Sequence, residues 1–314
     1  MTLATFRRLI LFCAAILAGT AAWAVEPRKP SSLSTGKVTV YESFESRHVD
    51  PRKVVVWVPD DPAASDRRHA VLYMHDGQNL FDDADATFGN EWGLDETITE
   101  LVKTGRMRPT IVVAIWNTPK RWNEYAPAAP LDAVTPRIIN PVNAARGRPV
   151  SDAYLRFIVE ELKPFIDANY PTRPDRQNTV TMGASMGGLI SLYALARHPD
   201  VFGGAAGVST HWPHSAIKDY APQPGDVLPP DAFIGWLRDN LPKPGAHRLY
   251  FDHGTLNLDA FYGPHHNKSD SMLKAIGWRP DVDYMARAFN DADHNEKSWR
   301  ARAHIPLTFL LPPD

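Results

Sequence analysis

The chain has very little cysteine and almost no excess of either charge. Cys13 is the single cysteine among 314 residues, so an internal disulfide framework and a cysteine-rich zinc or iron–sulfur site are both excluded. The 34 Lys and Arg residues nearly balance the 36 Asp and Glu residues, which gives a formal net charge of −2. This balance offers no basic surface for nucleic acid, so we expect no nucleic-acid partner.

Glycine is scarce relative to proline, at 19 residues against 28, and the prolines follow no collagen-like period. Apolar residues make up 44% of the chain and charged residues 22%, which is typical of a globular protein and argues against disorder. The length is sufficient to bury a large core in one or two domains. The proline content predicts stiff, extended loops between the regular elements.

Residues 1–24 have the features of a secretory signal peptide. Arg7 and Arg8 precede an apolar run over residues 9–18, and Ala22-Trp23-Ala24 fits a cleavage signal. The apolar run is too short to span a bilayer comfortably. We therefore expect cleavage after Ala24, and a periplasmic or secreted protein with no stable membrane association after cleavage.

The segment 25–36 is expected to be a flexible leader, because it is rich in proline and serine. Cys13 would leave with the signal peptide, so the mature chain would contain no cysteine and would need no oxidative folding. The sequence gives no indication of the oligomeric state.

Hydrophobic patterning predicts an alternation of strands and helices from residue 37 onward. Continuous apolar runs such as Ala70–Met74 and Thr110–Ile115 are typical of strands buried on both faces of a parallel sheet. Amphipathic spacing predicts a helix over Asp152–Asp167, where Pro164 is expected to cause a kink. The pattern favours an α/β fold: one domain at 37–314, with a mostly parallel central sheet and helices on both faces. The other expected strands are Lys37–Phe44, Lys53–Val58, Asn178–Met182, Val201–Val208, Arg248–Asp252 and Tyr284–Phe289, and the other expected helices are Leu94–Lys103, Met186–Arg197, Asp231–Asn240 and Ser269–Ile276.

One stretch, residues 212–245, differs from the rest in its concentration of proline. We interpret it as an insertion that contains one short helix and could cover a site.

The sequence Gly183-Ala184-Ser185-Met186-Gly187 matches G-x-S-x-G and stands directly between a predicted strand and a predicted helix. In this context the motif predicts a nucleophile elbow, a sharp strand-to-helix turn that exposes the serine hydroxyl. Small residues are needed because neighbouring backbone passes close to the turn. The amide of Met186, at the start of the helix, is expected to point to where an oxyanion develops.

A nucleophilic serine needs a histidine base and an orienting acid, which follow it in the order acid, then histidine, in this arrangement. We select His294 as the base, because it lies in a polar loop after the last predicted strand. His253, His265 and His266 are alternatives near the preceding strand. The adjacent pair His265-His266 could also suggest a metal site, but neighbouring side chains diverge on most backbones, so we predict no metal.

Two carboxylates compete for the role of the acid. Asp252 ends a predicted strand, whereas Asp259 lies several residues into the following loop. We favour Asp259, because a loop carboxylate more easily reaches an imidazole on the next loop, and we keep Asp252 as the alternative.

The second oxyanion donor is expected from the loop His75-Asp76-Gly77-Gln78-Asn79, and the amide of Gln78 is the candidate. The nearby Arg121 and Glu124 are three residues apart and are interpreted as a structural ion pair. The residues expected to line a substrate site are Trp92, Trp122, Tyr125 and His211.

Several segments resemble the putative-esterase family of α/β-hydrolases, which includes enterochelin esterases, esterase D, feruloyl-type esterases and mycolyltransferases. The segments are Tyr73-Met74-His75-Asp76-Gly77-Gln78-Asn79-Leu80-Phe81-Asp82, Asn123-Glu124-Tyr125-Ala126-Pro127, Gly183-Ala184-Ser185-Met186-Gly187-Gly188-Leu189 and His294-Asn295-Glu296-Lys297-Ser298-Trp299. The resemblance implies an α/β-hydrolase domain, Ser185 as nucleophile, His294 as base, and no cofactor. The loop from Gly254 to Asp259 is longer than in many members of the family, so Asp252 stays an alternative.

The function predicted from these features is that of an exported serine esterase acting on a small-molecule or glycan ester, of a carbohydrate or siderophore type. The same triad could instead transfer the acyl group to a sugar hydroxyl. A catalytically silent ligand-binding homologue is a third reading, which the presence of Ser185, His294 and two candidate acids disfavours.

Overall fold

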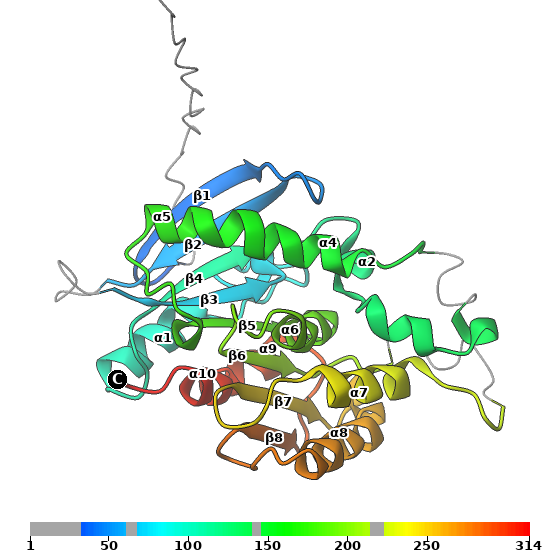
Figure 1. The fold of residues 1–314 in the computed structure, drawn as a ribbon. Coiled ribbons are helices and arrows are strands. Elements are labelled where there is room, and N and C mark those ends of the chain that lie inside the picture. The colour runs from blue at the N-terminus through cyan, green and yellow to red at the C-terminus, as the bar shows by residue number, and fades with distance from the viewer. Residues whose placement is uncertain (1–32, 61–67, 140–145, 214–222) are drawn as a thin grey trace, which may run out of the picture.

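A computed structural model describes residues 33–60, 68–139, 146–213 and 223–314. Its centre is an eight-stranded sheet in the order β1-β2-β4-β3-β5-β6-β7-β8 (Figure 1). The strands are β1 (Lys37–Phe44), β2 (Arg52–Val58), β3 (Ala70–His75), β4 (Thr110–Ile115), β5 (Thr179–Ala184), β6 (Gly204–Val208), β7 (Arg248–Gly254) and β8 (Tyr284–Phe289).

The sheet is mixed but mostly parallel, as predicted. The pairs β1–β2 and β2–β4 are antiparallel, and every pairing from β4 through β3 to β8 is parallel. The carboxyl ends of the parallel strands therefore meet at one edge, where loops carry binding and catalytic groups in open α/β sheets.

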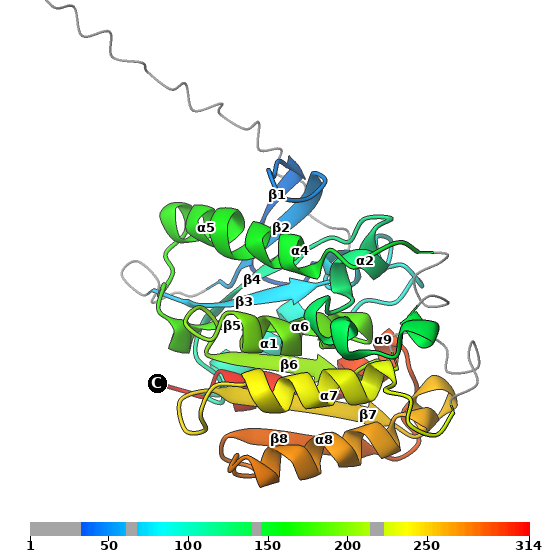
Figure 2. The same cartoon turned by 45° about the vertical axis from the view of Figure 1, so that its right-hand side comes forward.

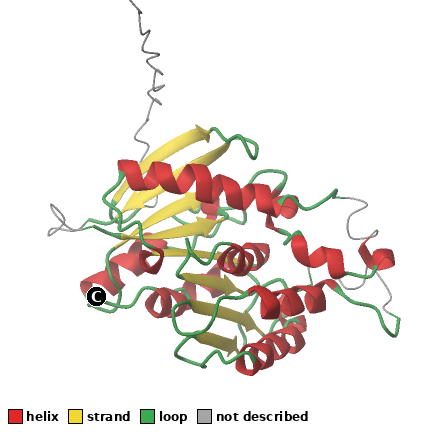
Figure 3. Cartoon of the chain, in the orientation of Figure 1, coloured by secondary structure: helices red, strands yellow, loops and turns green. Residues whose placement is uncertain are grey.

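Helices cover both faces of the sheet (Figure 3). Tyr73 of β3 packs with one layer and its neighbours Leu72 and Met74 with the other, because successive side chains of a strand point to opposite faces. The first layer contains α4 (Ser151–Arg156), the π-helical segment η3 (Phe157–Leu162), α5 (Lys163–Asn169), α6 (Met186–Arg197), α7 (Pro229–Asn240) and α8 (Gly263–Ala275), and the second contains α1 (Leu94–Lys103), α9 (Glu296–Arg302) and α10 (His304–Leu310).

The helix predicted over 152–167 is present, and the disturbance expected from Pro164 takes a specific form. Hydrogen bonding changes to the π type over Phe157–Leu162, immediately before the turn that contains Pro164. A proline cannot donate the helical hydrogen bond, and a π segment is one way to accommodate it. The helix begins at Ser151, and Asp152 does not cap it, since its Oδ1 accepts a hydrogen bond from Tyr193 Oη instead.

The proline-rich stretch does not form a separate cap where the structure describes it. Helix α7 packs against α6 and α8 in the same layer (Figure 2). Phe233 and Leu237 of α7 are buried in the main core, so α7 is the crossover helix between the parallel strands β6 and β7. Residues 214–222 of this stretch lie outside the described residues.

The predicted signal peptide also lies outside the described residues, as does most of the predicted leader. The last part of that leader packs onto the domain: Leu33 is buried, and Ser34 donates hydrogen bonds to Asp95 and Glu96 of α1. Over the described ranges, no helix combines the length and apolar character needed to cross a membrane.

Candidate active site

Ser185 occupies the turn between β5 and α6 with φ 57° and ψ −122°, a backbone conformation that non-glycine residues rarely adopt. A Cβ atom added to Gly183 would lie 2.7 Å from the main-chain carbon of Gly187, so the close approach of strand and helix requires glycine here. The predicted elbow is therefore present in the backbone.

Main-chain hydrogen bonds hold this strained turn in place. The amide of Ser185 donates to Val208 of β6, and its carbonyl accepts from Gly188, Leu189 and His211. Because the surrounding backbone determines the conformation, the serine side chain is held at the carboxyl edge of the sheet, half-buried and reachable from solvent.

Asp259 and His294 are joined by a short hydrogen bond between Oδ1 and Nδ1, at 2.6 Å. The two residues follow different strands, β7 and β8. Their loops touch at Gly254, where an added Cβ would lie 2.1 Å from the carbonyl oxygen of Ala292, so only glycine permits this contact. The loop carboxylate thus reaches the imidazole on the next loop, as the sequence argument expected.

The second oxygen of Asp259 is also occupied. Oδ2 accepts hydrogen bonds from Ser209 Oγ at 2.5 Å and from the amide of Gly254 at 2.6 Å. Burial by itself raises the pKa of this carboxyl, but the hydrogen bonds from His294 and Ser209 outweigh it and lower the pKa below the usual value. Asp259 is therefore held as a carboxylate that can orient the imidazole.

Asp252, the alternative acid, has a different set of partners. Its carboxylate receives two hydrogen bonds from Arg302, at 3.1 Å each, together with bonds from Tyr250 Oη and the amide of Ser209. These donors fill the positions that an imidazole would need. Asp252 therefore binds the main chain of Ser209 and the side chain of Arg302.

Three residues of this network were missed by the sequence argument: Ser209, Arg302 and Trp299. Ser209 follows β6 and has φ 43°. Its Oγ accepts hydrogen bonds from Arg302 Nη2 at 2.7 Å and from Trp299 Nε1 at 2.9 Å. Trp299 also packs its ring edge-on against His294, with centroids 5.1 Å apart. No spacing rule marks these residues, although Trp299 falls within a segment that carried the family resemblance.

Within the described residues, no hydrogen bond joins Ser185 Oγ to His294. His211 contacts Ser185 and Tyr262: its amide donates to the Ser185 carbonyl, and its Nδ1 lies 2.6 Å from Tyr262 Oη. The Tyr262 ring meets the His294 ring edge-on, with centroids 5.8 Å apart. Catalytic hydrogen bonds are often long in unliganded sites and tighten in the substrate complex.

The two expected oxyanion donors are the amides of Gln78 and Met186. Gln78 lies in the 3₁₀ turn η1 (Gly77–Asn79), and Met186 is the first residue of α6. Neither amide donates a hydrogen bond to any other group in the described parts of the chain. Both N–H groups are therefore available to a ligand, as an oxyanion hole requires.

Asp76 lies in the loop 75–79, which is expected to supply the second oxyanion donor and is called the oxyanion loop below, and it has a left-handed conformation with φ 56° and ψ 47°. Arg121 donates two hydrogen bonds to its carboxylate, at 2.7 and 2.8 Å, and Asn117 donates a third. Burial raises the pKa of Asp76, but the charge and hydrogen bonds of Arg121, together with the hydrogen bond from Asn117, outweigh burial and the pKa falls. A Cβ added to Gly187 would lie 3.4 Å from Asp76 Oδ2, so this ion pair adjoins the first turn of α6.

The predicted ion pair between Arg121 and Glu124 is not formed. Both residues lie on α2 (Arg121–Tyr125), but Arg121 binds Asp76, and Glu124 receives two hydrogen bonds from the buried Arg52. The prediction was wrong about the partners, because helical spacing says nothing of charges brought in from other strands.

The four residues expected to line a substrate site have different surroundings. Trp92 and Tyr125 are buried: Trp92 packs on Trp299, and the Tyr125 hydroxyl accepts from the Asp76 amide. Because both side chains are buried, neither is exposed to contact a substrate. Trp122 is half-buried under the Arg146 guanidinium, 3.9 Å from its ring, and His211 lies beside Ser185.

Two of the alternative histidines, His253 and His266, have other partners. His253 Nδ1 lies 2.5 Å from the Gly254 carbonyl oxygen, and its ring packs on His266, whose pKa is lowered to about 4 by burial. Across the described residues, no group of three or more His, Cys, Asp or Glu side chains could hold a metal ion.

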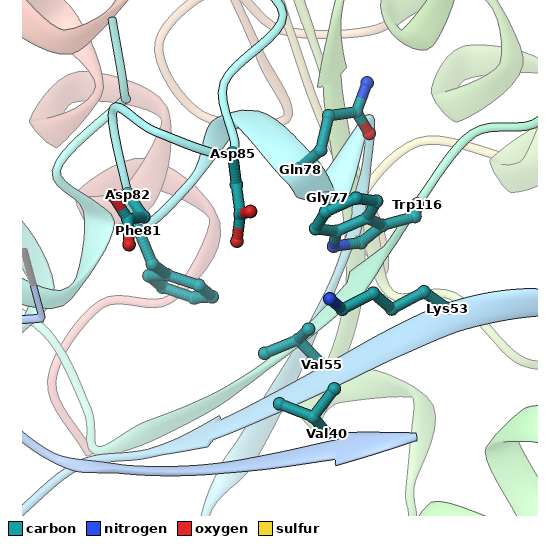
Figure 4. A pocket seen from close by; sticks show the side chains of 9 residues that line it. All are labelled: Val40, Lys53, Val55, Gly77, Gln78, Phe81, Asp82, Asp85 and Trp116. Carbon is teal, nitrogen blue, oxygen red and sulfur yellow. The ribbon is translucent and has the colours of Figure 1, made fainter. Parts of the chain in front are cut away.

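A small hollow of about 20 Å³ lies beside the oxyanion loop, with Gly77 and Gln78 at its edge (Figure 4). Lys53, whose ammonium lies 4.3 Å from the Trp116 ring centroid, and Asp85 lie on opposite sides of it. This volume has room for about one water molecule, so the hollow is too small for a substrate.

Comparison with known proteins agrees with this geometry. A family model described as "Putative esterase" matches residues 48–302. The fold resembles a solved ferulic acid esterase, with a TM-score of 0.60 and 18% identity over 88% of this chain and 98% of that chain. It also resembles the enterobactin esterase FES from Shigella flexneri, with a TM-score of 0.59 and 18% identity over 90% of this chain and 60% of that chain.

One curated sequence, the uncharacterized protein YbbA of Bacillus subtilis (strain 168), is 23% identical over 177 residues. The match covers 56% of this chain and 64% of that protein, so the two are aligned over less than two thirds of either length.

Proposed function

Because the chain belongs to the family described as "Putative esterase", we propose that it is a serine esterase that cleaves carboxylic esters through an acyl-enzyme intermediate. Ser185 is the nucleophile, His294 the general base, and Asp259 the acid that orients the imidazole. The amides of Gln78 and Met186 form the oxyanion hole. The proposed substrates are small-molecule or glycan esters, of the carbohydrate or siderophore type.

The reaction proceeds in two steps. Ser185 Oγ attacks the ester carbonyl carbon while His294 Nε2 takes the hydroxyl proton, and the oxyanion receives hydrogen bonds from the two amides. Collapse of the tetrahedral intermediate breaks the bond to the alcohol, which leaves with the proton from His294. Water then attacks the acyl-enzyme, His294 takes its proton, and the carboxylic acid is released as the proton returns to Ser185.

The observation that carries this proposal is the hydrogen bond from His294 to Asp259 at the edge of the sheet where Ser185 occupies a strained turn. The bond to Nδ1 fixes the imidazole tautomer and leaves Nε2 to act on the serine proton. The free amides of Gln78 and Met186 add the electrostatic part of the proposed site, at roughly 3 kcal/mol for each donor.

A fluorophosphonate probe tests the nucleophile directly. The wild-type protein should be labelled, and Ser185→Ala should not. Ser191→Ala is the matched control, because Ser191 is a buried serine of the same helix whose hydroxyl bonds only the Gly187 carbonyl. Labelling that survives in Ser185→Ala would show that another residue reacts.

Export is part of the proposal and rests on the sequence pattern of residues 1–24. Expression of the full chain in a bacterium, followed by fractionation and N-terminal sequencing, should give a product that begins at Val25. A cytoplasmic product that retains Met1 would contradict export without affecting the esterase proposal.

A further inference from the structure

Glu296 is a buried carboxyl next to the proposed base that the mechanism above does not use. Only 3% of the residue is exposed. Among the described residues, no other side chain forms a hydrogen bond with its carboxylate, which accepts one from its own main-chain amide, and the nearby His294 and Arg121 charges favour its ionised form. A carboxylate can accept about four hydrogen bonds, so this group keeps acceptor capacity for a ligand.

Glu296 lies at the wall of a cavity that His294 also lines. The cavity has a volume of about 380 Å³ and is bounded by Phe88, Asn90, His294, Asn295, Glu296 and Lys297. It is far larger than the hollow beside the oxyanion loop, and it has room for a small organic group.

The mechanism determines which part of a substrate enters this cavity. His294 Nδ1 is bound to Asp259, so Nε2 is the atom that returns a proton to the departing oxygen. The leaving alcohol must therefore lie against His294. Since the same cavity is bounded by His294 and Glu296, the alcohol portion is the part that meets Glu296.

The surroundings favour a neutral donor over a cation. Burial, together with the nearby Asp76 charge, raises the pKa of Glu296. Lys297 lines the same cavity and would repel an ammonium group. Part of the lining is apolar, because Phe88, which is 75% exposed, belongs to the same cavity.

We propose that Glu296 is a specificity-determining residue that accepts a hydrogen bond from a free hydroxyl group on the leaving alcohol of the substrate. This inference rests on the serine-esterase function proposed above. It assigns to the site a preference for esters of polyhydroxylated alcohols over esters of simple alkanols, because a site with a buried hydrogen-bonding group discriminates against a ligand that lacks the partner.

The test compares two esters of one carboxylic acid, namely the acid whose aryl ester the wild-type protein cleaves fastest. One is its glycerol monoester and the other its propyl ester, which has the same carbon chain without the free hydroxyls. For Glu296→Ala we expect kcat/KM on the glycerol ester to fall at least about tenfold, mainly through KM, and kcat/KM on the propyl ester to change by less than about twofold. Glu296→Gln should keep most of the preference, since its amide oxygen still accepts a hydrogen bond.

Glu100→Ala is the matched control, because Glu100 is an exposed glutamate on α1. Thermal melting and fluorophosphonate labelling establish that each variant is folded and retains Ser185 in a reactive state.

Equal losses on both esters, or a loss of labelling in a folded Glu296→Ala protein, would overturn the assignment, because Glu296 would then act through His294. A wild-type protein with no preference for the glycerol ester would overturn it as well. If the wild-type protein is neither labelled nor able to cleave any aryl ester, the proposed function itself fails, and the assignment fails with it.

Discussion

The hydroxyl of Ser209 donates a hydrogen bond to Asp259 Oδ2, and the arrangement of neighbouring donors requires this direction. Arg302 and Trp299 both donate to Ser209 Oγ, so its single proton can only be directed at the carboxylate. The Ser209 amide in turn donates to Asp252. Two aspartates, an arginine and a serine thus form one network that fixes the acid of the proposed triad.

Ser209→Ala removes a hydrogen bond to a buried carboxylate. We expect kcat to fall about tenfold, because Asp259 loses one of its three donors and orients the imidazole less firmly. The measurement is steady-state kinetics on an aryl ester. The control is Ser269→Ala on α8, which removes a buried serine hydroxyl bonded to the His265 carbonyl and should leave kcat unchanged. Equal kinetics for the two variants would count against the orienting role.

Asp259→Asn should mainly reduce catalysis, whereas Asp252→Asn should mainly reduce stability. The first disturbs the imidazole tautomer, so kcat should fall by about 10³- to 10⁴-fold while the melting temperature changes little. The second leaves the buried Arg302 without its bidentate partner, which should cost about 3 kcal/mol or more of stability.

Thermal melting and initial rates on both variants, measured below their melting temperatures, separate these effects. An Asp252→Asn protein that is stable but almost inactive would transfer the role of the acid to Asp252.

Arg121→Ala leaves the buried Asp76 carboxylate without its ion pair. Since Asp76 lies in the oxyanion loop and adjoins the first turn of α6, we expect kcat to fall about 10- to 100-fold with a smaller change in KM. Arg156→Ala is the control, because it removes an exposed arginine from a surface ion pair with Glu160 and should change kcat little. Unchanged kcat in Arg121→Ala would mean that the loop keeps its position without the ion pair.

The raised pKa of Glu91 predicts that the stability of the protein depends on pH. Burial and the nearby Glu96 and Asp95 raise its pKa to about 7 in the folded protein, above the ordinary value near 4.5. Between these values the folded state binds a proton that the unfolded state lacks, so this group's contribution to stability is present at low pH and is lost as pH rises through about 7.

Glu91→Gln removes this dependence. The free energy of unfolding of the variant, minus that of the wild type, should increase by about 2 kcal/mol from pH 5 to pH 8. Urea unfolding at the two pH values measures it, with the exposed Glu100→Gln as reference. A wild-type minus variant difference that stays constant with pH would contradict the argument.

Local patterning was sufficient to predict most of the fold. The helices Leu94–Lys103 and Met186–Arg197 and the strands Lys37–Phe44 and Thr110–Ile115 have the expected bounds, because periodicity and flanking glycines determine them. The helices α9 and α10 were not predicted. They are short and closely spaced, and α10 contains Pro306, so neither has a long periodic face.

The site shows the same division between local and distant information. The elbow at Ser185 is local, and the backbone has the expected turn. The contact between Asp259 and His294 was expected from loop reach, and the two residues do meet, while their catalytic roles stay predictions. Ser209 and Arg302 lie 93 positions apart in the chain and are joined only by the folded sheet, so no spacing could indicate their contact.

The segment after β8 supplies His294, Glu296, Trp299 and Arg302. Ser185 and its elbow are synthesised more than a hundred residues earlier. During vectorial synthesis, therefore, the nucleophile can fold with its sheet while the groups that would activate it do not yet exist. The chain would acquire its activity only after the segment that follows β8 has been synthesised and has folded onto the sheet.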